Sequence, residues 1–168
     1  MENSLIPISN IDFKNTVDIK FNNILDGFDL FKSFTINGNI TNGEEKIIEF
    51  IEKIFEENID NTYIDFYINK ISDEDKDNLI NLLSPNDKDT LKKLMHITHD
   101  GVYFKLLQKS LIPFFVRLNT REVFFVTFYF TNIPITIWGN YNMNFPCFVD
   151  SKESLEYYLQ LATKLNLT

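Results

Sequence analysis

The run EVFFVTFYFT, residues 122–131, is the most strongly β-forming stretch of the chain. It consists mostly of aromatic and β-branched residues, which favour strands. Side chains in a strand alternate between the two faces of a sheet. One alternating set would be Phe124, Val126, Phe128 and Phe130, and the other Phe125, Thr127 and Tyr129. Both sets are apolar enough to be buried, so we expect a central strand that is covered on both faces.

Further strands are expected on both sides of this run. Residues 114–118 would pair with it in a hairpin that turns at Asn119-Thr120. Alternation of apolar and polar residues also predicts strands at 17–21, 31–36, 61–69, 135–137 and 141–149. A turn is expected at Asp26-Gly27. Residues 102–107 fit either a strand or a short helix.

Four stretches have the apolar spacing of an amphipathic helix. They cover residues 43–57, 72–83, 85–97 and 150–165, with Asp150 as the expected cap of the last one. Helices therefore gather in the middle of the chain and strands near its end, which predicts an α+β fold. We expect a mostly antiparallel sheet, with strands concentrated in the C-terminal half, packed by about four helices. A chain of 168 residues is the usual size of a single domain, here residues 1–168.

The net charge of −8 is unevenly distributed. Residues 1–101 contain 20 acidic and 10 basic side chains, whereas residues 102–168 contain 4 acidic and 6 basic ones. An acidic surface repels the phosphate backbone of nucleic acids and attracts basic proteins. Charged runs of this kind also simply keep helix faces in solvent. We therefore expect no nucleic-acid partner.

Cys147 is the only cysteine, so the chain cannot form an internal disulfide. The first residues lack the basic and apolar regions of a secretion signal. The longest nearly apolar stretch is too short to span a bilayer. These features predict a cytoplasmic protein that does not enter a membrane.

The strongest candidate for metal chemistry is the group His96, His99 and Asp100, because two histidines three residues apart can share one helix face. A histidine near the end of a helix also stabilises the helix dipole, which explains both without a metal. Cys147 lies between Pro146 and Phe148 in an apolar strand pattern, which is typical of an inert core cysteine. We therefore predict no catalytic residue, no cofactor and no metal.

Aromatic side chains offer a second kind of candidate site. An RNA-binding sheet interleaves its aromatics with arginine and lysine, and residues 123–130 have neither. Trp138 and Tyr141 lie in a segment rich in asparagine, and such aromatics are common in binding hot spots. If this segment is a tight turn instead, its asparagines supply the turn geometry.

A small acidic domain without a recognisable catalytic motif is better suited to binding than to catalysis. We therefore predict a non-catalytic protein-interaction domain that binds a basic protein, such as a bacterial immunity or antitoxin-type inhibitor. The expected contact surface is Glu45, Glu49, Glu52, Glu56, Asp73, Glu74, Asp77, Trp138 and Tyr141. The alternatives are a metal-dependent enzyme at His96, His99 and Asp100, and a domain that binds a small ligand between sheet and helices.

Overall fold

The computed structural model describes residues 4–97 and 99–168. Within them, seven strands form one antiparallel sheet in the order β1-β4-β3-β5-β6-β7-β2. The strands are β1 (Leu5–Pro7), β2 (Lys32–Asn37), β3 (Thr62–Asp65), β4 (Tyr103–Leu106), β5 (Phe128–Phe130), β6 (Ile135–Ile137) and β7 (Asn144–Val149). The expected α+β class and antiparallel sheet are confirmed.

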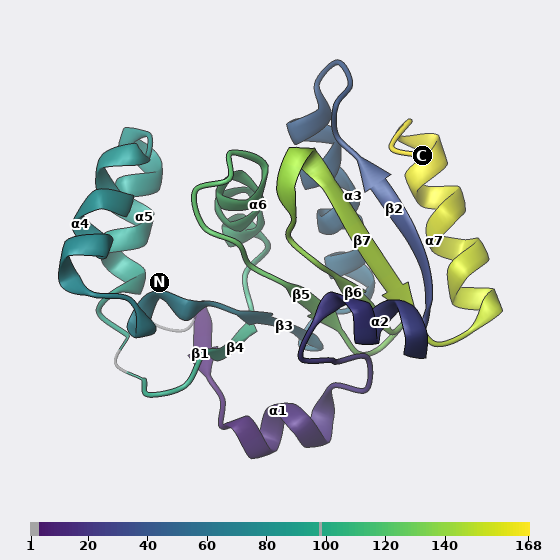
Figure 1. Ribbon diagram of the computed structural model, residues 1–168, viewed down its shortest axis with the longest axis horizontal. Coiled ribbons are helices and arrows are strands. Elements are labelled where there is room, and N and C mark those ends of the chain that lie inside the picture. The colour runs from purple at the N-terminus through teal and green to yellow at the C-terminus, as the bar shows by residue number, and fades with distance from the viewer. Residues whose placement is uncertain (1–3, 98) are drawn as a thin grey trace.

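Seven α-helices and three short 3-10 helices accompany the sheet in the described residues. The α-helices are α1 (Asn10–Thr16), α2 (Ile24–Leu30), α3 (Gly43–Glu57), α4 (Asp73–Leu82), α5 (Pro85–Leu94), α6 (Ile112–Thr120) and α7 (Lys152–Lys164). The 3-10 helices are η1 (Tyr67–Lys70), η2 (Lys109–Leu111) and η3 (Tyr141–Met143). In Figure 1, α4 and α5 lie side by side at one end of the molecule, and α7 lies along β2 at the other end.

The main core lies between one face of the sheet and helices α3, α5, α6 and α7. We call this side of the sheet the helix face. Side chains such as Ile64, Phe128 and Ile137 from the sheet join Phe50 of α3 and Phe115 of α6 in one buried apolar cluster. Of the strand expected at 122–131, only Phe128–Phe130 is a strand. Val126, Phe128 and Phe130 are buried in this cluster, and Phe124 packs against it partly buried.

The other face of the sheet is covered by residues 8–31, which run across it as α1, an extended connection and α2. Phe13 and Val17 form a small second core there with Tyr63 and Tyr129. Since β5 is the fourth of the seven strands and both of its faces are covered, the expectation of a central strand is also confirmed.

The location of the strands and the number of helices differ from the prediction. Three of the strands (β1, β2 and β3) lie in the first half of the chain, so strands are not concentrated in the C-terminal half. The four expected helices correspond to α3, α4, α5 and α7, while α1, α2 and α6 were not expected. The undecided residues 102–107 form strand β4.

The hairpin expected at residues 114–131 is wrong in its first arm, which is helix α6. Pro113 lies in the first turn of that helix, where its fixed φ angle suits a helix start. Phe114, Phe115 and Val116 are all buried. The partly exposed residues Pro113, Arg117 and Thr120 recur at helical spacing. A short apolar run such as 114–116 nevertheless fits a buried strand as well as a helix.

The strand expected at residues 17–21 is also wrong, and so is the turn at Asp26-Gly27, which lies inside α2. Val17 and Ile19 are buried as the alternation requires, at 1% and 2% exposed. Both belong to the segment that crosses the sheet without pairing with it, and their side chains are buried under that segment. Alternate burial alone therefore does not distinguish such a segment from a strand.

Smaller corrections concern the ends of elements. Helix α7 is capped by Ser151, whose hydroxyl accepts from the Ser154 amide, rather than by Asp150. The strand expected at 61–69 ends at Asp65 and continues as η1. Among residues 4–97 and 99–168, no helix has the length and apolar character that crossing a membrane requires.

Candidate functional site

The face of the sheet opposite the helix face carries polar aromatic side chains instead of aliphatic ones. Because neighbouring residues of a strand point in opposite directions, the residues next to Ile64, Phe104, Phe128 and Ile137 point to this side. We call the set Tyr63, Asp65, Tyr103, Thr127, Tyr129 and Trp138 the tyrosine face. Such a set, on the central strands of a sheet, is the most distinctive feature of the molecule.

Helix α1 is held on the tyrosine face by ring stacking. The ring of Phe13 is parallel to that of Tyr103 with centroids 3.6 Å apart, and it meets Tyr129 edge-on at 4.9 Å. The serine cap of α1 is Ser9, whose hydroxyl accepts from the Asp12 amide. The helix therefore starts at a defined residue and directs Phe13 at the sheet.

The connection and α2 are held farther along the same face. The hydroxyl of Thr136 donates to the carbonyl oxygen of Ile19. Phe21 packs against Trp138 and Phe148 at centroid distances of 5.3 and 4.7 Å. Gly27 of α2 lies over the Phe21 ring, and a Cβ atom there would approach that ring to 2.7 Å. A side chain at this position would displace Phe21 from the sheet.

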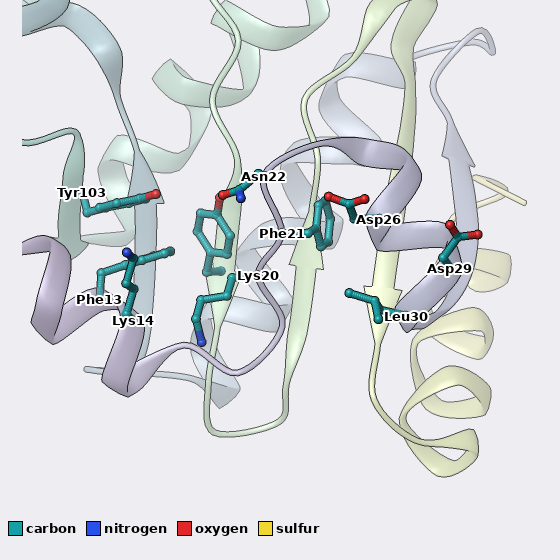
Figure 2. Close-up of a pocket in the computed structure, with 10 residues that line it drawn as sticks. Phe13, Lys14, Lys20, Phe21, Asn22, Asp26, Asp29, Leu30 and Tyr103 are labelled. Atoms are coloured by element: carbon teal, nitrogen blue, oxygen red, sulfur yellow. The ribbon is translucent and has the colours of Figure 1, made fainter.

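Between α1 and α2 the covering is incomplete and leaves an open hollow of about 570 Å³. Its aromatic lining comes from Phe13, Phe21, Tyr103 and Tyr129. Figure 2 shows Lys14 beside Phe13 and Tyr103 at one end, and Asp26 and Asp29 beside Leu30 at the other. Lys20 and Asn22 lie between these ends, so the hollow combines aromatic walls with two cations and two carboxylates.

A second hollow of about 280 Å³ opens on the other side of the Tyr129–Asp65 contact, and we call it the aromatic pocket. Its lining is Asp65, Tyr67, Phe125, Thr127, Trp138, Gly139, Asn140 and Tyr141. Phe125 and Tyr141 meet edge-on at 4.7 Å. Tyr67 is 45% exposed and Tyr141 is 59% exposed, so both stand at the mouth of the pocket.

The loop that forms one wall of the aromatic pocket is fixed from below by Asn119 of α6. The Asn119 side chain donates to the carbonyl of Val126 and accepts from its amide, at 2.8 and 2.7 Å. A Cβ atom at Gly139 would come within 2.4 Å of the Asn119 Oδ1 atom. Because residue 139 is glycine, its backbone can lie directly against the Asn119 side chain, and this contact sets the position of Trp138.

Asp65 is the buried ionisable group of the site, at 8% exposed. Its Oδ1 accepts from the Thr127 amide at 2.7 Å, and its Oδ2 accepts from the Tyr129 hydroxyl at 3.2 Å. Among the described residues, no ion pair is formed with Asp65. Burial raises the pKa of Asp65 to about 6, although both hydrogen bonds favour the ionised form.

The pKa values of the tyrosines around Asp65 are raised as well. Burial, followed by the negative charge of Asp65, raises the pKa of Tyr67 and puts that of Tyr129 far above its usual range. Burial also raises the pKa of Tyr103. All three hydroxyls therefore remain protonated at neutral pH, and that of Tyr129 donates to Asp65.

The acidic residues of the predicted contact surface lie elsewhere. Glu45, Glu49, Glu52 and Glu56 are on α3, which packs on the helix face, and Asp73, Glu74 and Asp77 are on α4. All seven are described, and none lines either hollow. Several are paired with lysines of the chain: Glu49 with Lys53, Glu52 and Glu56 with Lys109, and Asp73 with Lys76.

The two aromatic residues of the predicted surface, Trp138 and Tyr141, do line the aromatic pocket. Sequence reasoning placed Asp65 and Tyr129 on faces opposite Ile64 and Phe128, but it did not bring them together. They are 64 positions apart and meet through the pairing of β3 with β5. The usable signal is an aspartate inside an apolar strand, where this residue type is depleted.

The alternative metal residues do not share a helix face, because α5 ends at Leu94, and only His99 and Asp100 lie near the start of the chain. The Nε2 atom of His99 lies 3.1 Å from the carbonyl oxygen of Ile8. Among the described residues, no group of three or more histidine, cysteine, aspartate or glutamate side chains is placed to hold a metal ion. Cys147 is buried in the main core, and burial raises the pKa of its thiol.

Comparisons of the chain with protein-family models, with curated proteins and with solved structures find no match.

Proposed function

We propose that this protein is a non-catalytic binding domain that recognises a basic protein through the tyrosine face. The observation that carries the proposal is Asp65, a buried carboxylate without a counter-charge in the described residues, surrounded by aromatic side chains next to two open hollows. Burying an unpaired carboxylate destabilises a fold. Such a group is kept where a partner supplies the missing positive charge.

The rim of this face adds apolar contact area. The side chains of Ile11 on α1 and of Leu25 and Leu30 on α2 are 70%, 70% and 69% exposed. Asp26 and Asp29 lie among them on α2. Apolar side chains grouped beside polar ones are typical of protein-contact surfaces.

The overall charge supports a basic partner. At a net charge of −8, long-range attraction would speed association with a positively charged protein. An immunity or antitoxin-type inhibitor that covers a basic bacterial toxin is the specific form of this proposal. We place it in the cytoplasm, consistent with a chain that cannot form an internal disulfide.

Photo-crosslinking in living cells tests the proposed surface. Leu30 at the rim of the tyrosine face is 69% exposed, and Leu82 on the acidic helix α4 is 71% exposed, so they are matched positions. A photoreactive phenylalanine analogue at position 30 is expected to capture a basic protein, and the same analogue at position 82 is not. Capture only at position 82 would move the contact to the acidic helices, and capture at neither would contradict a protein partner.

A small ligand in the open hollow is the second candidate, because its volume of about 570 Å³ matches that of small-molecule sites. Its two cations, Lys14 and Lys20, and its carboxylates, Asp26 and Asp29, suit a zwitterion such as an amino acid. We expect such a ligand to raise the melting temperature of the wild type but not of Lys14→Met. No rise with any standard amino acid would count against this candidate.

A further inference from the structure

The aromatic pocket has the size of a single side chain. Its volume of about 280 Å³ is just below the range of roughly 300–1,000 Å³ that whole small-molecule ligands occupy. Tyr67 and Tyr141 stand exposed at its mouth, so a side chain can enter without a change in the fold. The occupant is therefore a slender group carried on a larger molecule, or a very small molecule.

The polar end of the pocket selects a hydrogen-bond donor. A carboxylate has about four acceptor positions on its two oxygens. Asp65 accepts from the Thr127 amide and the Tyr129 hydroxyl, and the Thr127 side chain also hydrogen-bonds it. These neutral donors leave part of its acceptor capacity and all of its charge unmatched, and Asp65 belongs to the lining of the pocket.

The walls of the pocket select a cation. Trp138, Tyr67, Tyr141 and Phe125 surround the space next to Asp65. Aromatic faces attract cations, and they do so most strongly where water is excluded. A flat guanidinium both stacks on aromatic rings and presents two parallel N–H groups to a carboxylate, whereas an ammonium does neither.

We propose that the aromatic pocket binds the guanidinium group of an arginine side chain of the basic partner, with Asp65 as its acceptor and Trp138 as its stacking platform. This inference rests on the proposed function, and it names the group that the partner inserts. In the complex, the arginine would supply the positive charge that Asp65 lacks among the described residues of the free chain.

The pocket can be tested with a defined probe, because Trp138 is the only tryptophan and its fluorescence reports directly on the site. The probe is N-acetyl-arginine amide, and its control is N-acetyl-citrulline amide, which has the same shape and no charge. Arginine amide is expected to change the emission saturably and to bind at least about tenfold more tightly than the citrulline compound. Equal binding of the two, or no saturable change, would overturn the inference.

Two substitutions locate the binding. Asp65→Asn keeps the shape of the side chain and is expected to weaken arginine binding about tenfold or more. The control Asp89→Asn removes an exposed carboxylate of α5 that lines neither hollow, and it is expected to leave the affinity unchanged. If Asp65→Asn does not fold, Tyr141→Ala decides: it changes a largely exposed residue, and unchanged arginine binding there would overturn the inference.

Acidification provides a test without substitution. The titratable groups that face Asp65 are Tyr129 from β5, Tyr103 from β4, Tyr67 from η1 and Tyr141 from η3. With its pKa raised to about 6, Asp65 is mostly ionised at pH 7 and mostly neutral at pH 5. Arginine affinity should therefore fall about tenfold over that interval, in proportion to the ionised fraction. If the arginine affinity is the same at pH 7 and pH 5, Asp65 is not the acceptor.

This inference and the proposed function fail in different ways. A basic protein captured at position 30, together with no arginine binding in the pocket, would overturn the inference and leave the proposed function standing. If the pocket binds arginine amide but no protein is captured, the guanidinium group does not come from the side chain of a partner protein. A free guanidinium compound would then be the ligand.

Discussion

The two faces of this sheet are built from the same strands but hold their buried carboxylates in opposite ways. On the helix side, Asp87 of α5 is 2% exposed and is bound by the guanidinium of Arg117, with contacts of 2.8 and 2.5 Å. On the tyrosine face, Asp65 is 8% exposed and has only neutral hydrogen-bond donors. The first carboxylate serves the fold, and we propose that the second is kept for a partner.

The comparison also extends to the pKa values. Burial acts to raise the pKa of Asp87, but hydrogen bonding and charge attraction from Arg117 outweigh it and lower the pKa. At Asp65 burial prevails and the pKa rises to about 6. Functional sites are the usual places where a protein retains such an unfavourable arrangement.

The largest expected effect concerns the helix face. Phe128→Ala removes a fully buried ring from the main core, and we expect the free energy of unfolding to fall by about 3–5 kcal/mol. Urea denaturation measures it as a lower midpoint. Tyr103→Ala, on the half-buried tyrosine face, should have at most half that effect. An equal loss in the two variants would contradict the difference between the faces.

Asp65→Asn is expected to stabilise the fold, by up to about 3 kcal/mol at pH 7.5. The folded-state pKa of about 6 lies above the unfolded value of about 4, so the folded wild type binds more protons between these values. Its stability therefore falls as the pH rises from about 4 to about 6 and then levels off. Urea denaturation of both proteins at pH 4 and pH 7.5 measures the difference, which should be small at pH 4.

Asp87→Asn is the matched control for this substitution and should have the opposite sign. It leaves Arg117 without its partner, and we expect a loss of about 2 kcal/mol at pH 7.5, less than for a fully buried pair because Arg117 is 26% exposed. The pKa of Asp87 is lowered, so its contribution is present above the unfolded pKa and is lost as the pH falls through the folded one. Losses of stability in both variants at pH 7.5 would show that Asp65 is a structural residue.

The smallest expected effect is that of Tyr129→Phe. The ring remains packed against Phe13 while one hydrogen bond to Asp65 is lost, and we expect about 0.5–1.5 kcal/mol of destabilisation. Loss of this donor should also move the pKa of Asp65 above its present value of about 6, as seen by carbon NMR of its carboxyl group. An unchanged Asp65 pKa would mean that the tyrosine hydroxyl does not support the carboxylate.

Local pattern was sufficient to predict the elements that have one buried and one exposed side. Helices α3, α4, α5 and α7 have such patterns, and their expected positions agree closely with the structure. In helix α6 the apolar run 114–116 also fits a buried strand, and residues 17–21 are buried alternately without pairing to a strand, so both were assigned to strands. In these segments the burial comes from the tertiary structure and overrides local propensity.

The candidate site was only partly predictable for a related reason. Trp138 and Tyr141 stand out by residue type alone, and the structure places both at the aromatic pocket. Asp65 is unusual by residue type in an apolar strand, but only strand order and register set it beside Tyr129 and Thr127. Sequence separations of more than sixty residues carry no local signal, so the central acceptor of the site was missed.

The order of the strands has a consequence for how the chain is made. Among the described residues, strand β2 pairs with β7 alone, more than a hundred residues later, from Lys32 opposite Val149 to Asn37 opposite Asn144. A nascent chain therefore carries an unpaired β2 until β7 has left the ribosome. Such distant pairing slows folding and exposes strand edges to aggregation. We expect the sheet to close only once β7 has been made, and a chaperone to protect β2 in the interval.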